Sequence, residues 1–142
     1  MLCAGALLGV TGVVLGAYGA HGLAAVADAG ALSSWNTAVD YQLIHAVVLL
    51  ILGVWQQQDP GNRAVNGLRW AGYFLIAGVL FFRGSIYFLV FGGPRFLGPV
   101  TPIGGTLLIA GWLAITWVAL LDNRDRKATA TEADKEPDRK TD

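Results

Sequence analysis

The distribution of charge constrains this chain more than any other feature of its sequence. Lysine, arginine, aspartate and glutamate make up 14% of the 142 residues, whereas about a quarter of an ordinary soluble domain is charged. Of the ten basic and ten acidic side chains, 13 follow residue 121, which leaves seven for the first 121 positions. A soluble fold could not solvate its surface with so few charges. The composition therefore excludes a soluble domain, and with it a nucleic-acid-binding protein.

Four apolar stretches lie within those first 121 residues, and each is long enough to cross a bilayer. A helix that spans a hydrocarbon core of about 30 Å needs roughly 20 apolar residues. In hydrocarbon the backbone must satisfy its own hydrogen bonds, so helices are expected, and the stretches lack the alternating pattern of membrane strands. We therefore predict an all-α integral membrane bundle of four transmembrane helices. The predicted spans are residues 2–20, 35–55, 70–91 and 101–121.

The basic residues of the loops predict the direction in which the helices cross. Lysine and arginine accumulate in the short loops on the cytoplasmic side of the membrane. The second loop carries Arg63 and Arg69, and Arg124, Arg126 and Lys127 follow the fourth span closely, whereas the first loop has no basic residue. Four spans place both ends of the chain on one side. We predict cytoplasmic termini and a multi-pass protein of the plasma (inner) membrane.

Tryptophan occurs near the ends of the predicted spans. The indole ring favours the level of the lipid headgroups. We therefore expect four of the five tryptophans to lie near the membrane surface. These are Trp35, Trp55, Trp70 and Trp117.

The composition changes sharply at residue 122. From there to residue 142 the chain has six basic and seven acidic side chains and no aromatic ones. Such a segment cannot bury enough apolar surface to offset the entropy that ordering costs. We therefore divide the chain into a transmembrane domain, residues 1–121, and a disordered, charged cytoplasmic tail, residues 122–142.

Glycines recur along the predicted helices at the spacing of a packing seam. Transmembrane helices associate through small residues, which let their backbones approach closely. In the first span the steps are four, three, four and three, and a repeat of 3.5 residues implies left-handed crossings. The seam could face a helix of the same chain or of a second copy. The glycines assigned to helix packing are Gly5, Gly9, Gly12, Gly16 and Gly19 in the first span, Gly78 in the third, and Gly104 and Gly111 in the fourth.

Polar side chains inside the spans gather in the half of the bundle that we place on the outer side. Thr37, Tyr41 and His45 are four residues apart, so they share one helix face. Polar groups are costly in a membrane and mark either a network that fixes helix register or a pocket for an ion, a small solute or a lipid headgroup. Both interpretations stay open. The candidate cluster is His21, Thr37, Asp40, Tyr41, Gln42, His45, Arg83, Ser85, Tyr87 and Thr101.

Arg83 lies deep in the third span, about 20 Å from Trp70 at 1.5 Å per helical residue. Asp40 is the acidic residue at comparable depth and is the candidate partner of this charge. The alternative is that Arg83 extends its guanidinium to the outer interface. His21 and His45 alone are too few for zinc, which takes three or four ligands. We expect no metal and no cofactor.

Four strings in the sequence resemble one known family. They are GAYGAHGL at 16–23, WNTAVDYQLIHA at 35–46, GSIY at 84–87 and LGPVTPIGG at 97–105. In this order and spacing, over about residues 1–121, the chain is similar to the YgdD-like inner-membrane proteins. That group is domain-of-unknown-function family 423, also called the UPF 0382 group, with eukaryotic relatives named transmembrane protein 256.

The resemblance implies a small protein with four membrane helices, and it implies no reaction. Where the family usually reads Phe-Ser-Gly-Ser, this chain has Phe82-Arg83-Gly84-Ser85, so the charge of Arg83 departs from the family pattern. The residues that the resemblance marks are His21, Trp35, Tyr41, Gln42, His45, Ser85, Tyr87, Thr101 and Pro102.

These observations favour a membrane-embedded binding or interaction protein. The alternative is a small-solute or ion transporter that acts as an oligomer. We do not expect an enzyme, because Gly-x-Ser-x-Gly, His-Glu-x-x-His and P-loop motifs are absent from the sequence. The first glutamate is Glu132, which argues against proton-coupled drug export through a membrane-embedded glutamate. The expected partners are the lipid bilayer and either further copies of the chain or another membrane protein, and no nucleic acid.

Overall fold

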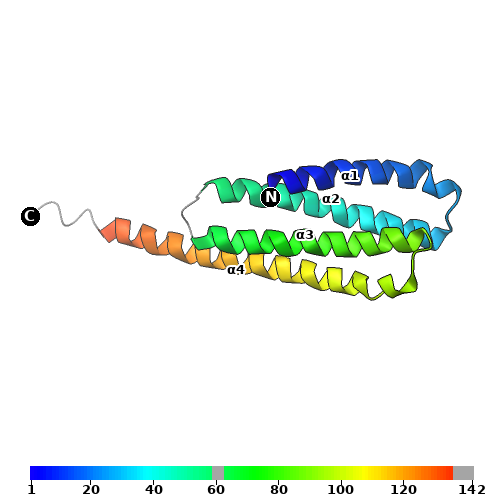
Figure 1. Ribbon diagram of the computed structural model, residues 1–142. Coiled ribbons are helices and arrows are strands. Elements are labelled where there is room, and N and C mark those ends of the chain that lie inside the picture. The colour runs from blue at the N-terminus through cyan, green and yellow to red at the C-terminus, as the bar shows by residue number, and fades with distance from the viewer. Residues whose placement is uncertain (59–62, 136–142) are drawn as a thin grey trace, which may run out of the picture.

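Four long helices make up most of the computed structural model, which describes residues 1–58 and 63–135. They are α1 (Leu2–His21), α2 (Ala29–Gln58), α3 (Arg63–Val90) and α4 (Val100–Lys135). The short turns η1 (Leu23–Ala25) and η2 (Arg95–Leu97) follow α1 and α3. Figure 1 shows the helices side by side in chain order. The α1–α2 and α3–α4 connections lie at one end, which we call the connection end, and Met1 and the end of α4 lie toward the other.

Each of these helices is long and apolar enough to cross a membrane. The stretches that meet this description are Leu2–Ala25, Ala29–Gln58, Val65–Val90 and Arg95–Thr129. The described residues form no strand. The predicted all-α fold with four membrane-spanning helices is therefore confirmed.

The second helix begins earlier than the predicted span. The Asp28 carboxylate accepts a hydrogen bond from the N–H of Ala31 at 2.8 Å, so Asp28 caps the helix. Trp35 consequently lies in the second turn, where it is only 1% exposed, and its Nε1–H donates to the carbonyl of Leu15 at 3.0 Å. The indole of Trp35 therefore packs inside the protein near the start of α2, and its position at the level of the membrane surface stays a prediction.

The fourth helix continues past the predicted end of the transmembrane domain. We predicted disorder from residue 122, but α4 runs as a helix to Lys135. Residues 112–135 contain no glycine or proline, and alanine, lysine, arginine and glutamate favour helix. Extending a helix that has already formed avoids the cost of nucleating a new one. Residues 136–142 of the predicted tail lie outside the described part of the chain.

The glycine seam of α1 faces α2 of the same chain. A Cβ atom added to Gly5, Gly12, Gly16 or Gly19 would lie within 3.3 Å of an α2 atom. Gly9 is the exception, because a Cβ there would meet nothing within 4 Å. Four of the five glycines thus let α1 approach α2, and Gly9 does not serve this contact.

Glycines also bring α3 and α4 together. A Cβ on Gly78 of α3 would lie 2.7 Å from the side chain of Leu108 in α4. In the other direction, Gly104 packs against the backbone of Phe82, and Gly111 packs against Leu75. The glycines therefore bring α1 close to α2 and α3 close to α4 within one chain.

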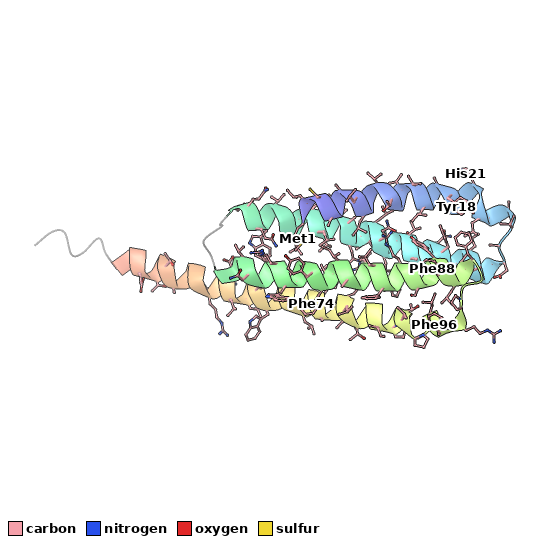
Figure 2. All side chains as sticks on the ribbon, in the orientation of Figure 1. Met1, Tyr18, His21, Phe74, Phe88 and Phe96 are labelled. Atoms are coloured by element: carbon pink, nitrogen blue, oxygen red, sulfur yellow. The ribbon has the colours of Figure 1, made fainter. Side chains whose placement is uncertain are left out.

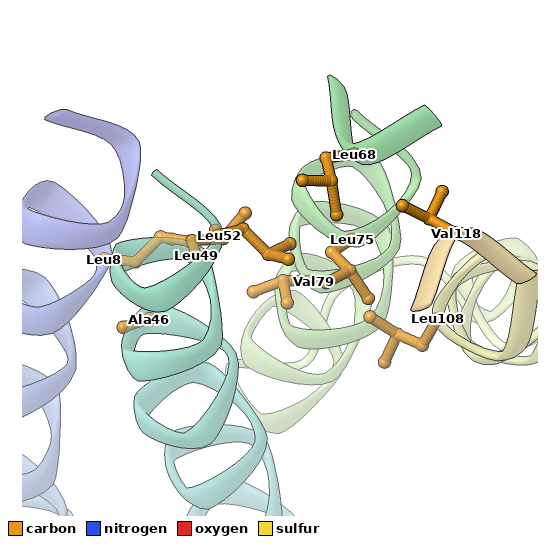
Figure 3. Close-up of a cluster of buried hydrophobic side chains, with 9 residues drawn as sticks. All are labelled: Leu8, Ala46, Leu49, Leu52, Leu68, Leu75, Val79, Leu108 and Val118. Carbon is orange, nitrogen blue, oxygen red and sulfur yellow. The ribbon is translucent and has the colours of Figure 1, made fainter. Parts of the chain in front are cut away.

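Apolar side chains from all four helices fill the half of the molecule away from the connection end (Figure 3). A smaller buried group of Leu23, Trp35 and Val39 lies near the connection end. Between these two groups lie the buried polar side chains of α2. The larger cluster consists of Leu8, Ala46, Leu49, Leu52, Leu68, Leu75, Val79, Leu108 and Val118.

Candidate functional site

The amide of Gln42 is the centre of the polar cluster. Its side chain is fully buried, with 0% exposure, on the face of α2 that turns toward the other helices. Its Nε2 donates to the carbonyl oxygen of Leu8 at 2.8 Å and to the hydroxyl of Thr11 at 2.7 Å. Both acceptors belong to α1, so the amide nitrogen ties α2 to α1.

The oxygen of the same amide binds α3. Gln42 Oε1 accepts hydrogen bonds from Arg83 Nη1 at 2.8 Å and from the Tyr87 hydroxyl at 3.0 Å. A glutamine amide has two N–H donors and two acceptor lone pairs. All four are used, and three helices are joined through one side chain.

Arg83 pairs with Gln42 and not with Asp40, so the expected ion pair is wrong. Two residues along a helix correspond to about 200° around its axis. Because α2 turns Gln42 toward α3, it turns Asp40 away, and Asp40 is exposed. Within the described chain Asp40 has neither a hydrogen bond nor an ion pair. Arg83 is half-buried, and its guanidinium lies against Gln42.

His45 is held by two contacts that define its protonation. Its Nδ1 lies 2.6 Å from the carbonyl oxygen of Tyr41, and its Nε2 lies 3.3 Å from the indole Nε1 of Trp112. A carbonyl can only accept and an indole N–H can only donate. In this arrangement Nδ1 donates to the Tyr41 carbonyl and Nε2 accepts from the Trp112 indole. Both ring nitrogens of His45 therefore have a partner within the chain.

Aromatic rings surround this histidine. Tyr41 stacks on Phe82 of α3, with ring centroids 4.7 Å apart, and on His45 at 5.9 Å. Trp112 meets the imidazole edge-on at 6.2 Å. Of the predicted stripe of Thr37, Tyr41 and His45, the last two contact α3 and α4.

A separate polar contact joins α3 to α4. The Ser85 hydroxyl donates to the carbonyl of Phe82 at 2.9 Å and lies 2.7 Å from the hydroxyl of Thr101. Because Ser85 uses its proton on the carbonyl, Thr101 is the donor in the second bond. Ser85 is 4% exposed, so this pair acts inside the protein.

The remaining candidates lie apart from the cluster. His21 is exposed at the connection end of α1, at the same end of the molecule as Phe96 but on the opposite side (Figure 2). Thr37 is exposed and donates to the carbonyl of Ser33 in its own helix. Together with Asp40 they form no part of the buried network.

The sequence analysis missed several residues that complete the site. Thr11 accepts from Gln42, and its signal was its position as the one aliphatic hydroxyl in the first apolar span. Trp112, the tryptophan farthest from a predicted span end, had the same kind of signal. Trp35 was not missed, because the family resemblance marks it, and its ring lies 4.4 Å from that of Tyr87 and 5.7 Å from that of Tyr18. These contacts hold Tyr87 in the orientation that reaches Gln42.

Comparisons with known proteins agree on one family. Residues 15–105 match the family described as "Protein of unknown function (DUF423)". A UPF0382 membrane protein of Staphylococcus haemolyticus (strain JCSC1435) is 45% identical over 111 residues, covering 78% of this chain and 87% of the relative. One from Staphylococcus epidermidis (strain ATCC 35984) is 41% identical over 116 residues, covering 82% and 91%. No solved structure matches the chain significantly.

Proposed function

Because the chain belongs to the DUF423 family, whose curated members are named UPF0382 membrane proteins, we propose that it works by binding other membrane proteins and catalyses no reaction. The family predicted from the four sequence strings is confirmed, and so is the membrane character of the protein. The family name carries no activity, so the support for the proposal comes from the geometry of the polar residues.

The saturation of Gln42 is the observation that supports this proposal. A site for a solute needs polar groups that can exchange one partner for another. Gln42 uses its two donors and two acceptor positions on groups of the same chain, and His45 likewise uses both ring nitrogens. We infer that the buried cluster holds the helices in register and that partners bind elsewhere.

The outward face of α2 supports a protein partner. Asp40 lies there, in a membrane-spanning helix, with no partner among the described residues. Ionisable groups inside a membrane almost always face protein or water and not lipid. A second protein that covers this face would supply the missing polar contact.

The transporter alternative receives no such support. The grooves described in the structure are lined by residues other than those of the Gln42 network. The basic loops remain the basis for cytoplasmic termini and for the plasma membrane as the location.

Native mass spectrometry tests the proposal on protein extracted gently with its own lipids. We expect the chain to carry a protein mass, either of further copies or of another membrane protein. His45→Ala should leave that composition unchanged, as should His21→Ala, the matched control at the exposed histidine. A discrete small-molecule mass that His45→Ala removes and His21→Ala retains would overturn the proposal. So would a bare chain that carries lipid and no protein.

A further inference from the structure

One face of α2 is exposed along most of the helix. Its residues follow steps of four and three, the heptad spacing with which parallel helices pack against each other. The four apolar members are between 49% and 60% exposed. We call this set the α2 stripe. It consists of Ser33, Thr37, Asp40, Ile44, Val47, Ile51 and Val54, all of them exposed.

Asp40 gives the stripe a chemical requirement. It lies 11 residues after Ala29, the start of the helix, which is about 16 Å along the axis. Lipid tails offer a carboxyl group no hydrogen bond. The described part of this chain offers none either. A molecule that covers the stripe at this level has to accommodate the exposed Asp40 carboxyl.

We propose that the α2 stripe is the contact between two copies of this chain, with the two Asp40 carboxyls facing each other. This inference rests on the proposed function and names its partner. Two copies inserted in the same direction are related by a two-fold axis along the membrane normal. Such an axis places each residue of the contact opposite the same residue of the other copy. Asp40 therefore faces the Asp40 of the second copy at the same depth. Two facing carboxyls can share one proton in a hydrogen bond.

The part of the α2 stripe farthest from the connection end borders a groove that can receive a second helix. A groove of about 490 Å³ lies on α2, where Ile51 and Val54 are joined in its lining by Leu50, Trp55 and Gln58. Ile51 and Val54 of the second copy would enter this groove while those of the first enter the equivalent one. A single polar pair within an otherwise apolar seam sets the register of two helices. Asp40 has that place in the stripe.

Cysteine cross-linking in native membranes tests the contact. The background is the full chain with Cys3→Ser, because Cys3 is exposed and is the only cysteine. Val47→Cys and Ile51→Cys place a thiol on the stripe. Val13→Cys in α1 and Leu113→Cys in α4 are the matched controls, since both residues are 64% exposed. Under mild oxidation we expect disulfide-linked dimers for the two stripe variants and none for the controls.

Substitution of Asp40 tests the polar pair separately. Asp40→Leu should weaken dimerisation in detergent by about 3- to 30-fold, the range for one interhelical polar contact. Asp40→Asn keeps a hydrogen bond across the axis and should remain close to the wild type. Thr116→Leu is the control, because Thr116 is exposed on α4 and bonds within its own helix. A carboxylate that merely faced lipid would predict unchanged or tighter dimers for Asp40→Leu.

The results separate this inference from the proposed function. Equal cross-linking at Val13 or Leu113, or none on the stripe, overturns the α2 contact. If native mass spectrometry then shows a different protein bound, the proposed function stands and the second copy is the wrong partner. A chain without any bound protein refutes both.

Discussion

Replacing Gln42 by leucine tests the buried network most directly. Leucine is similar in size to glutamine and suits a fully buried position, but it lacks the amide. Four hydrogen bonds are lost at once: those to the Leu8 carbonyl and the Thr11 hydroxyl, and those from Arg83 and Tyr87. Because these bonds join α1 and α3 through α2, the loss affects the whole helix arrangement.

The expected cost follows from the number of bonds and from what they leave behind. Interhelical hydrogen bonds in membranes average about 0.6 kcal/mol, so four contribute about 2.4 kcal/mol. The half-buried Arg83 is then left without its acceptor, which adds about 2 kcal/mol. We expect Gln42→Leu to lower the free energy of unfolding by about 4 kcal/mol.

Unfolding by sodium dodecyl sulfate from mild detergent micelles, followed by circular dichroism, measures this loss. Gln42→Leu combined with Arg83→Leu should recover about 2 kcal/mol, because the orphaned guanidinium is gone. The matched control is Thr37→Val, which removes an exposed hydroxyl that bonds only within its own helix. A Gln42→Leu protein within about 1 kcal/mol of the wild type would refute the network as a source of stability.

Three further predictions concern helix contacts. Gly5→Val should destabilise the protein by about 2 kcal/mol or more, because its Cβ would meet a backbone carbonyl of α2, whereas Gly9→Val faces open space and should be neutral in the same unfolding assay. Trp112→Phe removes the donor to His45 and should cost about 1 kcal/mol, with a shift of the imidazole nitrogen-15 resonances that identify the tautomer. Trp35→Phe removes the bond to a carbonyl of α1 and leaves buried space, so it should cost about 2 kcal/mol by the same unfolding measurement.

The features that the sequence predicted well are those that a single helix determines by itself. Apolar length locates a span without reference to its neighbours, and all four spans are present. The glycine spacing identified close-packing faces for the same reason. The start of α2 at Ala29 and the extension of α4 to Lys135 were missed. The first depends on the Asp28 cap, and the second on the continuation of an existing helix, and composition averaged over a segment shows neither.

The pairing of polar groups could not be predicted because it depends on how each helix is rotated. Charge complementarity favoured Asp40 for Arg83, and Asp40 lies only two residues from Gln42, which Arg83 contacts. The choice between Asp40 and Gln42 is a choice between opposite faces of α2. That rotation is set by the glycine seam and by Trp35, which dock α1 and α3 on the face that carries Gln42. Tertiary packing therefore decided which polar residue Arg83 meets.

The two faces of α2 differ in whether their polar side chains have hydrogen-bond partners within the chain. We use this difference to infer which face binds a partner. On the inner face, Gln42 and His45 have all their hydrogen-bonding positions filled from within the chain. On the outer face, Asp40 has no partner among the described residues. Gln42→Leu should therefore lower stability first and partner binding only as a consequence. Asp40→Leu should leave the unfolding curve of the single chain unchanged while it reduces the bound protein mass. If Asp40→Leu instead destabilised the isolated chain as much as Gln42→Leu does, the outer face would be part of the fold, and the partner surface would have to lie elsewhere.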